Sequence, residues 1–208
     1  MTQIKICGLM RPADVVMVNQ ALPNAIGMVF APGRRRRITM ATARQLAQQL
    51  DSRIRRVGVF TTNQLSEILA LVQQHIIQVA QLHAAADDPR IAYLMAAHVL
   101  MIQAMTPANA VKCQADYLLL DNTCPGSGQV LDWERLQSQR PTRPFILAGG
   151  LTPINVTTAI NKLQPAMIDV SSGVETAGNK DHNKINLMVQ RAHQTGVSAP
   201  LLTENRRN

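Results

Sequence analysis

Short apolar runs and amphipathic stretches alternate eight times along this 208-residue chain. Two of the stretches have clear helical periodicity, at residues 40–50 and 63–74. Parallel strands need a crossover for each connection, and eight strand–helix units can close into a ring. We therefore expect an α/β protein with a single, compact (β/α)8 barrel of the TIM type. Its strands are predicted at residues 3–7, 25–30, 55–60, 76–82, 98–103, 116–121, 144–148 and 167–170.

Helix-start signals and the even spacing of the units support one domain. Residues that favour the first turn or the cap of a helix precede several of the expected helices: Pro12, Thr106-Pro107, Thr152-Pro153 and Asp181. No linker or second apolar block interrupts the chain. We expect a barrel domain over residues 1–202 and a polar, basic tail at residues 203–208.

Composition narrows the classes of partner. Aromatic residues make up only 3% of the chain, which is unsuited to a stacking surface for single-stranded nucleic acid. The net charge of +8 fits either a polyanion or a small substrate that carries phosphate and carboxylate groups. Cys7, Cys113 and Cys124 lack metal-ligand spacing and indicate free thiols. Neither a signal peptide nor a membrane-spanning run is seen, so we expect a soluble, cytoplasmic protein with no membrane partner.

In a barrel of this type, chemistry takes place where the strands end, at the carboxyl-terminal face. The ends of the predicted strands and the residues just after them carry thiol, carboxyl, imidazole and glycine-rich groups. These strand ends are Cys7, Phe30-Ala31-Pro32, Phe60-Thr61, Gln81-Leu82-His83, Gln103, Asp121, Ala148-Gly149-Gly150 and Val170-Ser171-Ser172-Gly173.

Several motifs near these strand ends occur in the order found in one enzyme family. They are Lys5-Ile6-Cys7-Gly8-Leu9 with Asp14, Met28-Val29-Phe30-Ala31-Pro32 with Arg36, Arg56-Val57-Gly58-Val59-Phe60, Val79-Ala80-Gln81-Leu82-His83, Leu118-Leu119-Leu120-Asp121, Pro125-Gly126-Ser127-Gly128, Asp132-Trp133, Leu147-Ala148-Gly149-Gly150-Leu151 and Ile168-Asp169-Val170-Ser171-Ser172-Gly173-Val174-Glu175. Over residues 3–190 the chain resembles the phosphoribosylanthranilate isomerases. It departs from the family pattern at Ala84, at Gln103, in the loop at residues 125–128 and at residues 129–131.

The resemblance implies an isomerase of tryptophan biosynthesis. Its reaction is the acid/base Amadori rearrangement of N-(5-phosphoribosyl)anthranilate to 1-(2-carboxyphenylamino)-1-deoxy-D-ribulose 5-phosphate, with no cofactor and no metal. Cys7 matches the family's general base and Asp121 its general acid. From the residues alone, a lone cysteine such as Cys7 in an apolar run is more often an inert buried residue, and Asp121 could equally be a helix cap or a loop acid. The position of Cys7 at a strand end within Lys5-Ile6-Cys7-Gly8, and the three leucines before Asp121, favour the catalytic roles.

The two groups are expected to face one another, because strands 7 and 8 lie between strand 6, which ends at Asp121, and strand 1, which ends at Cys7. Cys7 needs surroundings that favour the thiolate. We expect that Lys5 does not favour the thiolate, because it is close to Cys7 in the sequence and side chains alternate along a strand. Asp121 needs a raised pKa to donate a proton near pH 7, most simply through desolvation.

Substrate contacts are expected on both sides of this pair. Gly149-Gly150 and Ser172-Gly173 follow strands 7 and 8, where barrels of this type bind phosphate through backbone N–H groups. By the resemblance, Arg36 binds the anthranilate carboxylate, whereas Arg34, Arg35 and Arg37 supply charge and solubility. His83 contacts substrate or closes a hydrogen-bond network. Asp169 is interpreted as a structural group with hydrogen-bond partners.

Two other functions stay open at this point. The first is another phosphosugar isomerase or epimerase on the same barrel, because fold does not determine function. The second is a basic protein that binds nucleic acid, although we expect at most weak, non-specific binding. We expect the chain to act as a monomer on a small-molecule substrate.

Overall fold

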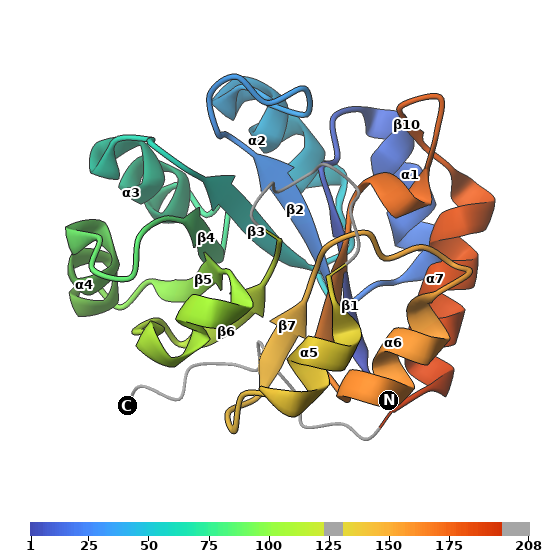
Figure 1. Cartoon of the computed structure of the whole chain (residues 1–208). Helices are drawn as coiled ribbons and strands as arrows, with labels where there is room; N and C mark the ends of the chain where they lie inside the picture. Colours follow the sequence, from blue (N-terminus) through green and yellow to red (C-terminus); the bar gives the residue numbers. More distant parts are fainter. Residues whose placement is uncertain (123–130, 197–208) are drawn as a thin grey trace.

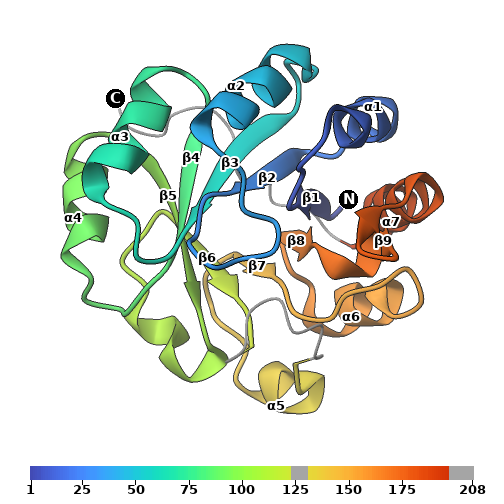
Figure 2. The ribbon, with the colours of Figure 1, turned by 90° about the horizontal axis from the view of Figure 1, so that it is seen from above.

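Eight parallel strands close into a barrel in a computed structural model that describes residues 1–122 and 131–196. The strands run in chain order around the ring, and β1 pairs with both β2 and β8 (Figure 2). The predicted single (β/α)8 barrel is therefore confirmed. The strands are β1 (Gln3–Cys7), β2 (Ala25–Val29), β3 (Arg55–Phe60), β4 (Val79–His83), β5 (Leu100–Met105), β6 (Tyr117–Leu120), β7 (Phe145–Leu147) and β8 (Met167–Val170).

Helices form the outer layer around the strands (Figure 1). A 3-10 helix, η1 (Pro107–Lys112), takes the place of an α-helix between β5 and β6. After β8 the chain forms a short 3-10 helix, η2 (Ser172–Val174), and a hairpin of β9 (Glu175–Thr176) and β10 (Asn179–Lys180). The α-helices are α1 (Pro12–Ala21), α2 (Met40–Gln49), α3 (Leu65–Gln73), α4 (Pro89–Ala96), α5 (Trp133–Ser138), α6 (Val156–Leu163) and α7 (His182–Gln194).

Several predicted boundaries differ from the structure. β4 was predicted to begin at residue 76, but Ile76 and Ile77 are buried in the connection before it. β5 was predicted to begin at His98, which instead takes a positive φ of 57° in a turn. Before β4 the apolar run extends into a buried connection, which residue type alone does not distinguish from a strand. Before β5 only Val99 is buried, and His98 is exposed.

The helix-start signals have mixed outcomes. Pro12 occupies the first turn of α1, and the Asp181 side chain accepts a hydrogen bond from the backbone N–H of Lys184 at the start of α7, as predicted. The predicted helix start at Thr152-Pro153 is wrong, because α6 begins at Val156. The Asn155 side chain accepts a hydrogen bond from the N–H of Thr152, so these residues form a turn before the helix.

The two faces of a barrel strand are buried against different partners, one against the helices and the other inside the barrel. Ile4 and Ile6 of β1 belong to the large apolar cluster between the barrel and the helices. Because side chains alternate along a strand, Lys5 and Cys7 point to the inside of the barrel. The interior is filled near its base by a separate apolar cluster that includes Val57, Val79, Ile102, Leu119 and Ile146.

The last helix closes the structure against its first strand. The N–H of Thr2 donates to the carbonyl oxygens of Ala192 (3.2 Å) and Thr195 (3.0 Å), and α7 also packs against α1 and α6. The expected tail at residues 203–208 lies outside the described residues. Across the described ranges, every helix is too short or too polar to cross a bilayer.

Candidate active site

A cavity of about 350 Å³ opens at the carboxyl-terminal ends of the barrel strands. It lies at the end of the barrel where the sequence placed the chemistry. The structure brings all eight predicted site residues to its wall: Cys7, Arg36, His83, Asp121, Gly149, Gly150, Ser172 and Gly173. The expected loop at residues 125–128 and Cys124 lie outside the described residues.

Cys7 is the last residue of β1 and is buried at the floor of the cavity. Gly27 of β2 lies beside it, and a Cβ atom at that glycine would lie 2.6 Å from the Cys7 Sγ. The absent side chain therefore makes room for the thiol. Burial raises the pKa of Cys7, whereas the charges of Lys5 and Lys180 act to lower it.

Lys5 lies beside Cys7, contrary to the expectation from its closeness in sequence. Residues two apart on a strand share a face, so both side chains point into the barrel. Lys5 is completely buried, and its Nζ forms an ion pair of 2.8 Å with Oδ2 of Asp169 on β8. Burial acts to lower the pKa of Lys5, but Asp169 and Cys7 together leave this pKa above its usual value.

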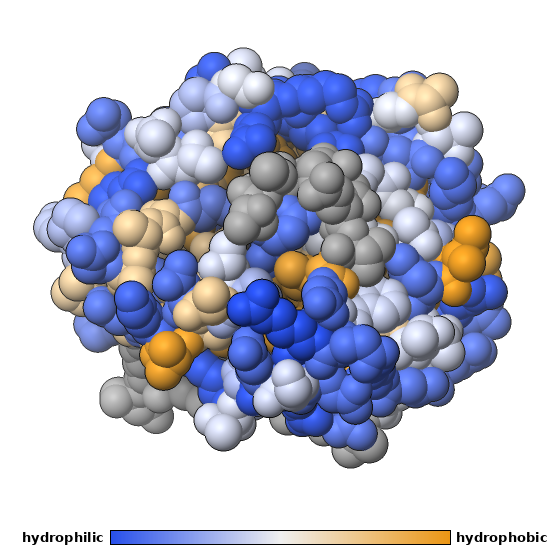
Figure 3. Space-filling model, in the orientation of Figure 1, coloured by the Kyte–Doolittle hydropathy of each residue, from blue (hydrophilic) through white to orange (hydrophobic). Residues whose placement is uncertain are grey.

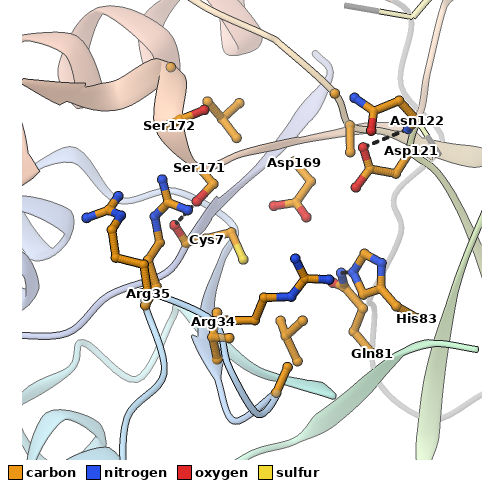
Figure 4. Close-up of a pocket in the computed structure, with 18 of the residues that line it drawn as sticks. Cys7, Arg34, Arg35, Gln81, His83, Asp121, Asn122, Asp169, Ser171 and Ser172 are labelled. Carbon is orange, nitrogen blue, oxygen red and sulfur yellow. Dashed lines mark hydrogen bonds between the residues drawn. The ribbon is translucent and has the colours of Figure 1, made fainter. Parts of the chain in front are cut away.

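Asp169 lines the cavity and also pairs with Lys5 in the barrel interior. Its Oδ2 has the partner that was expected, but its buried Oδ1 has no hydrogen-bond partner among the described residues. Asp169 lines the cavity, and Figure 4 shows it between Cys7 and Asp121.

Asp121 follows directly after β6, and its backbone N–H donates to the carbonyl of Met105. Its Oδ1 accepts a hydrogen bond of 2.8 Å from the N–H of Asn122. Burial raises the pKa of Asp121 to about 6, the charge of Asp169 adds to the rise, and the hydrogen bond from Asn122 opposes it. A carboxyl group of this kind can donate a proton near neutral pH.

The loops after β7 and β8 face the arc between these two groups. Gly149 and Gly150 have φ angles of 86° and 63°, a region that favours glycine. A Cβ atom at Gly173 would lie 1.8 Å from the carbonyl oxygen of Leu151, so the two loops touch through their backbones. Only glycine fits this contact, which leaves backbone N–H groups close to the cavity.

The arginines after β2 differ in their contacts: Arg35 and Arg36 pair with Glu175, and Arg34 lies across the cavity. Arg36 forms a two-point ion pair with Glu175, with Nε–Oε1 at 2.6 Å and Nη2–Oε2 at 2.9 Å. Arg35, expected only to add charge, also bonds Glu175 and donates to the carbonyl of Gly178. Arg34, likewise expected only to add charge, lines the cavity and reaches across it toward Gln81 and His83 (Figure 4).

Glu175 joins the loop after β2 to the hairpin after β8. Besides Arg35 and Arg36, it pairs with the buried Lys180 at 3.0 Å. Burial opposes ionisation of Glu175, but the hydrogen bond from Arg36 and the charge of Lys180 lower its pKa to about 2. Lys180 also donates to the carbonyl of Cys7 at 2.7 Å. The sequence analysis gave no role to Glu175 or Lys180, because the contact of Glu175 with Arg36 and that of Lys180 with Cys7 form only when the barrel closes.

His83 ends β4 and lines the cavity beside Gln81, with 3.1 Å between His83 Nε2 and Gln81 Nε2. Burial, followed by the charges of Lys5 and Arg34, lowers the pKa of His83 to about 4. The imidazole is therefore neutral at neutral pH, so its part in the site is hydrogen bonding. The structure shows the hydrogen-bond contact, and contact with substrate stays a prediction.

Two further residues from the sequence analysis lie away from the cavity floor. The side chain of Gln103, where the family pattern has lysine, donates to Ala85 and accepts from the N–H of Gln114. Cys113 is half-buried near the carbonyls of Ala115 and Tyr117. Within residues 1–122 and 131–196, His, Cys, Asp and Glu side chains form no group of three suited to a metal ion.

Comparison with known proteins connects this site to one family. A family model described as N-(5'phosphoribosyl)anthranilate (PRA) isomerase matches residues 4–191. The chain is 87% identical over 208 residues to the N-(5'-phosphoribosyl)anthranilate isomerase of Lactiplantibacillus plantarum, covering 100% of both. It is 44% identical over 195 residues to that of Lacticaseibacillus casei, covering 93% of this chain and 96% of the relative.

Solved structures agree with the sequence relatives. The phosphoribosyl anthranilate isomerase of Thermus thermophilus has a TM-score of 0.82 at 34% identity, covering 93% of this chain and 99% of that one. A phosphoribosyl anthranilate isomerase in complex with reduced 1-(o-carboxyphenylamino)-1-deoxyribulose 5-phosphate has a TM-score of 0.77 at 28% identity, covering 93% and 100%. The chain belongs to the N-(5'-phosphoribosyl)anthranilate isomerase family.

Proposed function

We propose that the chain isomerises N-(5-phosphoribosyl)anthranilate to 1-(2-carboxyphenylamino)-1-deoxy-D-ribulose 5-phosphate, a step of tryptophan biosynthesis. The observation that carries the proposal is the pair formed by Cys7 and Asp121, which face one cavity from opposite sides (Figure 4). The related isomerase solved with a reduced form of this product supports the choice of substrate. So does the net charge of +8, because the substrate carries phosphate and carboxylate groups.

The two groups divide the proton transfers between them. Asp121, protonated in part near pH 6, gives its proton to the furanose ring oxygen. The C1–O bond breaks, and the ring opens to a protonated imine. The Cys7 thiolate then takes the proton from C2, and the electron pair of the C2–H bond forms the C1–C2 double bond of an enolamine. Return of the proton from Cys7 to C1, with loss of the C2 hydroxyl proton to the Asp121 carboxylate, gives the ketone and restores both groups, with no net gain or loss of electrons.

The ends of the substrate are assigned to different loops. The backbone N–H groups around Gly149, Gly150, Ser172 and Gly173 bind the phosphate, supported by the close contact of these two loops. Arg36 binds the carboxylate at the other end. Glu175 takes up Nε and Nη2 of Arg36, whereas no hydrogen bond within the described residues occupies Nη1. His83 is assigned a neutral hydrogen-bond contact with the substrate.

The test is a fluorescence assay that follows consumption of N-(5-phosphoribosyl)anthranilate by the purified protein. We expect Cys7→Ala and Asp121→Asn each to lower kcat by about 10²–10⁴-fold, the usual contribution of acid or base catalysis. Cys113→Ala is the matched control, because this cysteine is not part of the cavity wall, and it should keep full activity. Absence of turnover by the folded, unmodified protein would contradict the proposal.

We further propose that the protein is a cytoplasmic monomer. Large apolar side chains that are exposed in the described residues are scattered, and the face in Figure 3 is mainly hydrophilic. The unpaired thiols of Cys7 and Cys113 are typical of a reducing compartment. Light scattering during gel filtration should give a mass near 22.8 kDa, and a mass of twice that value would contradict the monomer.

A further inference from the structure

A buried lysine inside a barrel needs an explanation, because desolvation of an ammonium group costs several kcal/mol unless it is paired. Lys5 has no exposed surface, and its Nζ is held at 2.8 Å by Oδ2 of Asp169. An apolar pair of similar volume would fill the same space at less cost. The ion pair therefore indicates a role other than packing.

The ammonium group of Lys5 lies next to the Cys7 thiol. The position of a Cβ atom built on Gly27 would be 2.6 Å from Cys7 Sγ and 3.1 Å from Lys5 Nζ, so one point on β2 touches both groups. Cys7 and Lys5 extend from the same face of β1, and the glycine opposite them leaves the space between them open. No apolar side chain of β2 separates the positive charge from the sulfur.

We propose that Lys5 is a positioning residue for proton transfer at Cys7: its ammonium group stabilises the Cys7 thiolate, and Asp169 holds the ammonium group in place. The inference deepens the proposed function and rests on Cys7 as its base. When the S–H bond breaks, the proton leaves to solvent and the negative charge on Sγ is paired with Lys5. The thiolate then has its electron pair available for the proton on C2 of the substrate.

The other charges around Cys7 are consistent with this role. Burial is the largest influence on the pKa of Cys7 and raises it, and Lys5 is the largest influence that lowers it. Asp169 on β8 acts to raise this pKa, and Lys180 on β10 acts to lower it. Lys180 donates its hydrogen bonds to the carbonyls of Cys7 and Ser171 and to Glu175, which accounts for its position. Lys5 is thus the cation next to the sulfur itself.

The test is that substitutions of Lys5 and of Asp169 should shift the pKa of Cys7 in opposite directions. In a Cys113→Ser/Cys124→Ser background, the rate of iodoacetamide alkylation against pH gives the thiolate pKa of Cys7 without substrate. Lys5→Met should raise this pKa by at least about one unit, since loss of a close opposite charge disfavours the thiolate. Asp169→Asn should lower it, because it removes a negative charge near the sulfur while the amide oxygen still accepts a hydrogen bond from the Lys5 ammonium group. A purely structural role for the pair predicts no such opposite shifts.

Kinetics extend the same test to turnover. With N-(5-phosphoribosyl)anthranilate, Lys5→Met should shift the acidic limb of kcat/KM to higher pH, with a loss of roughly tenfold or more at pH 7 and partial recovery at high pH. Lys162→Met removes a lysine on α6 that pairs with Glu134, and it should change neither readout. Because alkylation needs no substrate, failure of the proposed function and failure of this inference give different results.

The double variant Lys5→Met/Asp169→Asn protects the test against misfolding. It removes both charges, so it leaves no unpaired ion in the barrel even if Lys5→Met alone does not fold. Because Lys5 influences Cys7 more strongly than Asp169 does, the pKa of Cys7 in the double variant should still lie above that of the unmodified protein. An unchanged thiolate pKa in a folded variant that lacks Lys5 would overturn the proposal.

Discussion

A carboxyl group in the position of Asp121 lowers the stability of the folded protein once it is ionised. Burial raises its folded-state pKa from 3.8 to about 6, so the unfolded chain loses this proton first as the pH rises. The resulting loss of stability begins near pH 4 and is complete above about pH 6. It amounts to a cost on the order of 3 kcal/mol at pH 8. The raised pKa that suits proton donation is thus obtained at the expense of stability.

The substitution Asp121→Asn separates these two effects. We expect it to lower kcat by about 10²–10⁴-fold, as proposed above, and to raise the midpoint of thermal unfolding at pH 8, because an amide of similar shape does not ionise. At pH 4 the carboxyl group of the folded protein is protonated, and the gain should disappear. Circular dichroism melts of both proteins at the two pH values measure this difference. Equal midpoint differences at pH 4 and pH 8 would show that Asp121 is not destabilised by its surroundings.

Single residues show where the sequence is informative and where it is not. The placement of Cys7 and Asp121 at one cavity could be predicted because Cys7 ends β1, Asp121 follows β6, and strand ends meet at one face of a barrel. Lys5 was missed because closeness in sequence was given more weight than the two-residue period of a strand, which brings Lys5 and Cys7 together. Glu175 was missed because its ion pair with Arg36 spans 139 residues, a contact that exists only after the ring closes.

At the scale of elements, the loop after β2 and the hairpin β9–β10 are held together by one carboxylate. The loop supplies Arg35 and Arg36, and the hairpin supplies Glu175 and Lys180. Because Arg36 lines the cavity and is held by this contact, the hairpin fixes the position of the arginine that we propose binds the substrate carboxylate. The two-residue strands of the hairpin gave no apolar pattern, which is why the sequence did not reveal it.

We expect Glu175→Gln to raise KM for N-(5-phosphoribosyl)anthranilate several-fold and to change kcat less, because the loop loses its charged anchor. The pKa of about 2 keeps Glu175 ionised at ordinary assay pH, and the stability from its ion pairs is lost only as the pH falls toward 2. The increase in KM should therefore be the same at pH 6 and at pH 8. Glu134→Gln, on the exposed pair with Lys162, is the control. A KM equal to that of the unmodified protein would show that the hairpin does not position Arg36.

The contact between the loops after β7 and β8 gives a second prediction for this scale. Gly173→Ala would place a Cβ atom 1.8 Å from the carbonyl oxygen of Leu151, and a backbone atom cannot turn aside as a side chain can. The loops must separate, so we expect at least a tenfold rise in KM, with inorganic phosphate becoming a weaker competitive inhibitor. Ser172→Ala keeps the backbone and should have a much smaller effect. Unchanged inhibition by phosphate in Gly173→Ala would rule out this loop as its binding site.

Strands and helices were predicted unequally well from the sequence. β1, β3 and β8 have the predicted bounds, because turn residues or a change of polarity limit their apolar runs on both sides. The 3-10 helix η1 was not distinguished from an α-helix, since Thr106-Pro107 is a start signal for either. Thr152-Pro153 was taken as a helix start because threonine followed by proline is a common one; in the structure the Asn155 side chain accepts from the Thr152 N–H instead, and the helix begins at Val156.

At the scale of the whole molecule, the net charge of +8 acts on the approach of an anionic substrate. We expect kcat/KM to fall as salt is raised to about 0.3 M, whereas kcat stays nearly constant, because screening weakens attraction in solution more than contacts in a closed site. Stopped-flow assays at several salt concentrations measure this. A salt-independent kcat/KM would mean that the charge serves solubility only.

The ion pair between Lys5 and Asp169 also ties the beginning of the chain to its end, since these residues are 164 positions apart and lie on neighbouring strands at the seam of the ring. A ribosome releases β1 long before it has made β8. Until the final strand docks, the emerging polypeptide lacks both the anchored ammonium group and the walls of the cavity. A nascent or truncated protein therefore lacks the site in which Cys7 is proposed to act, and that site is complete only when synthesis and assembly have both finished.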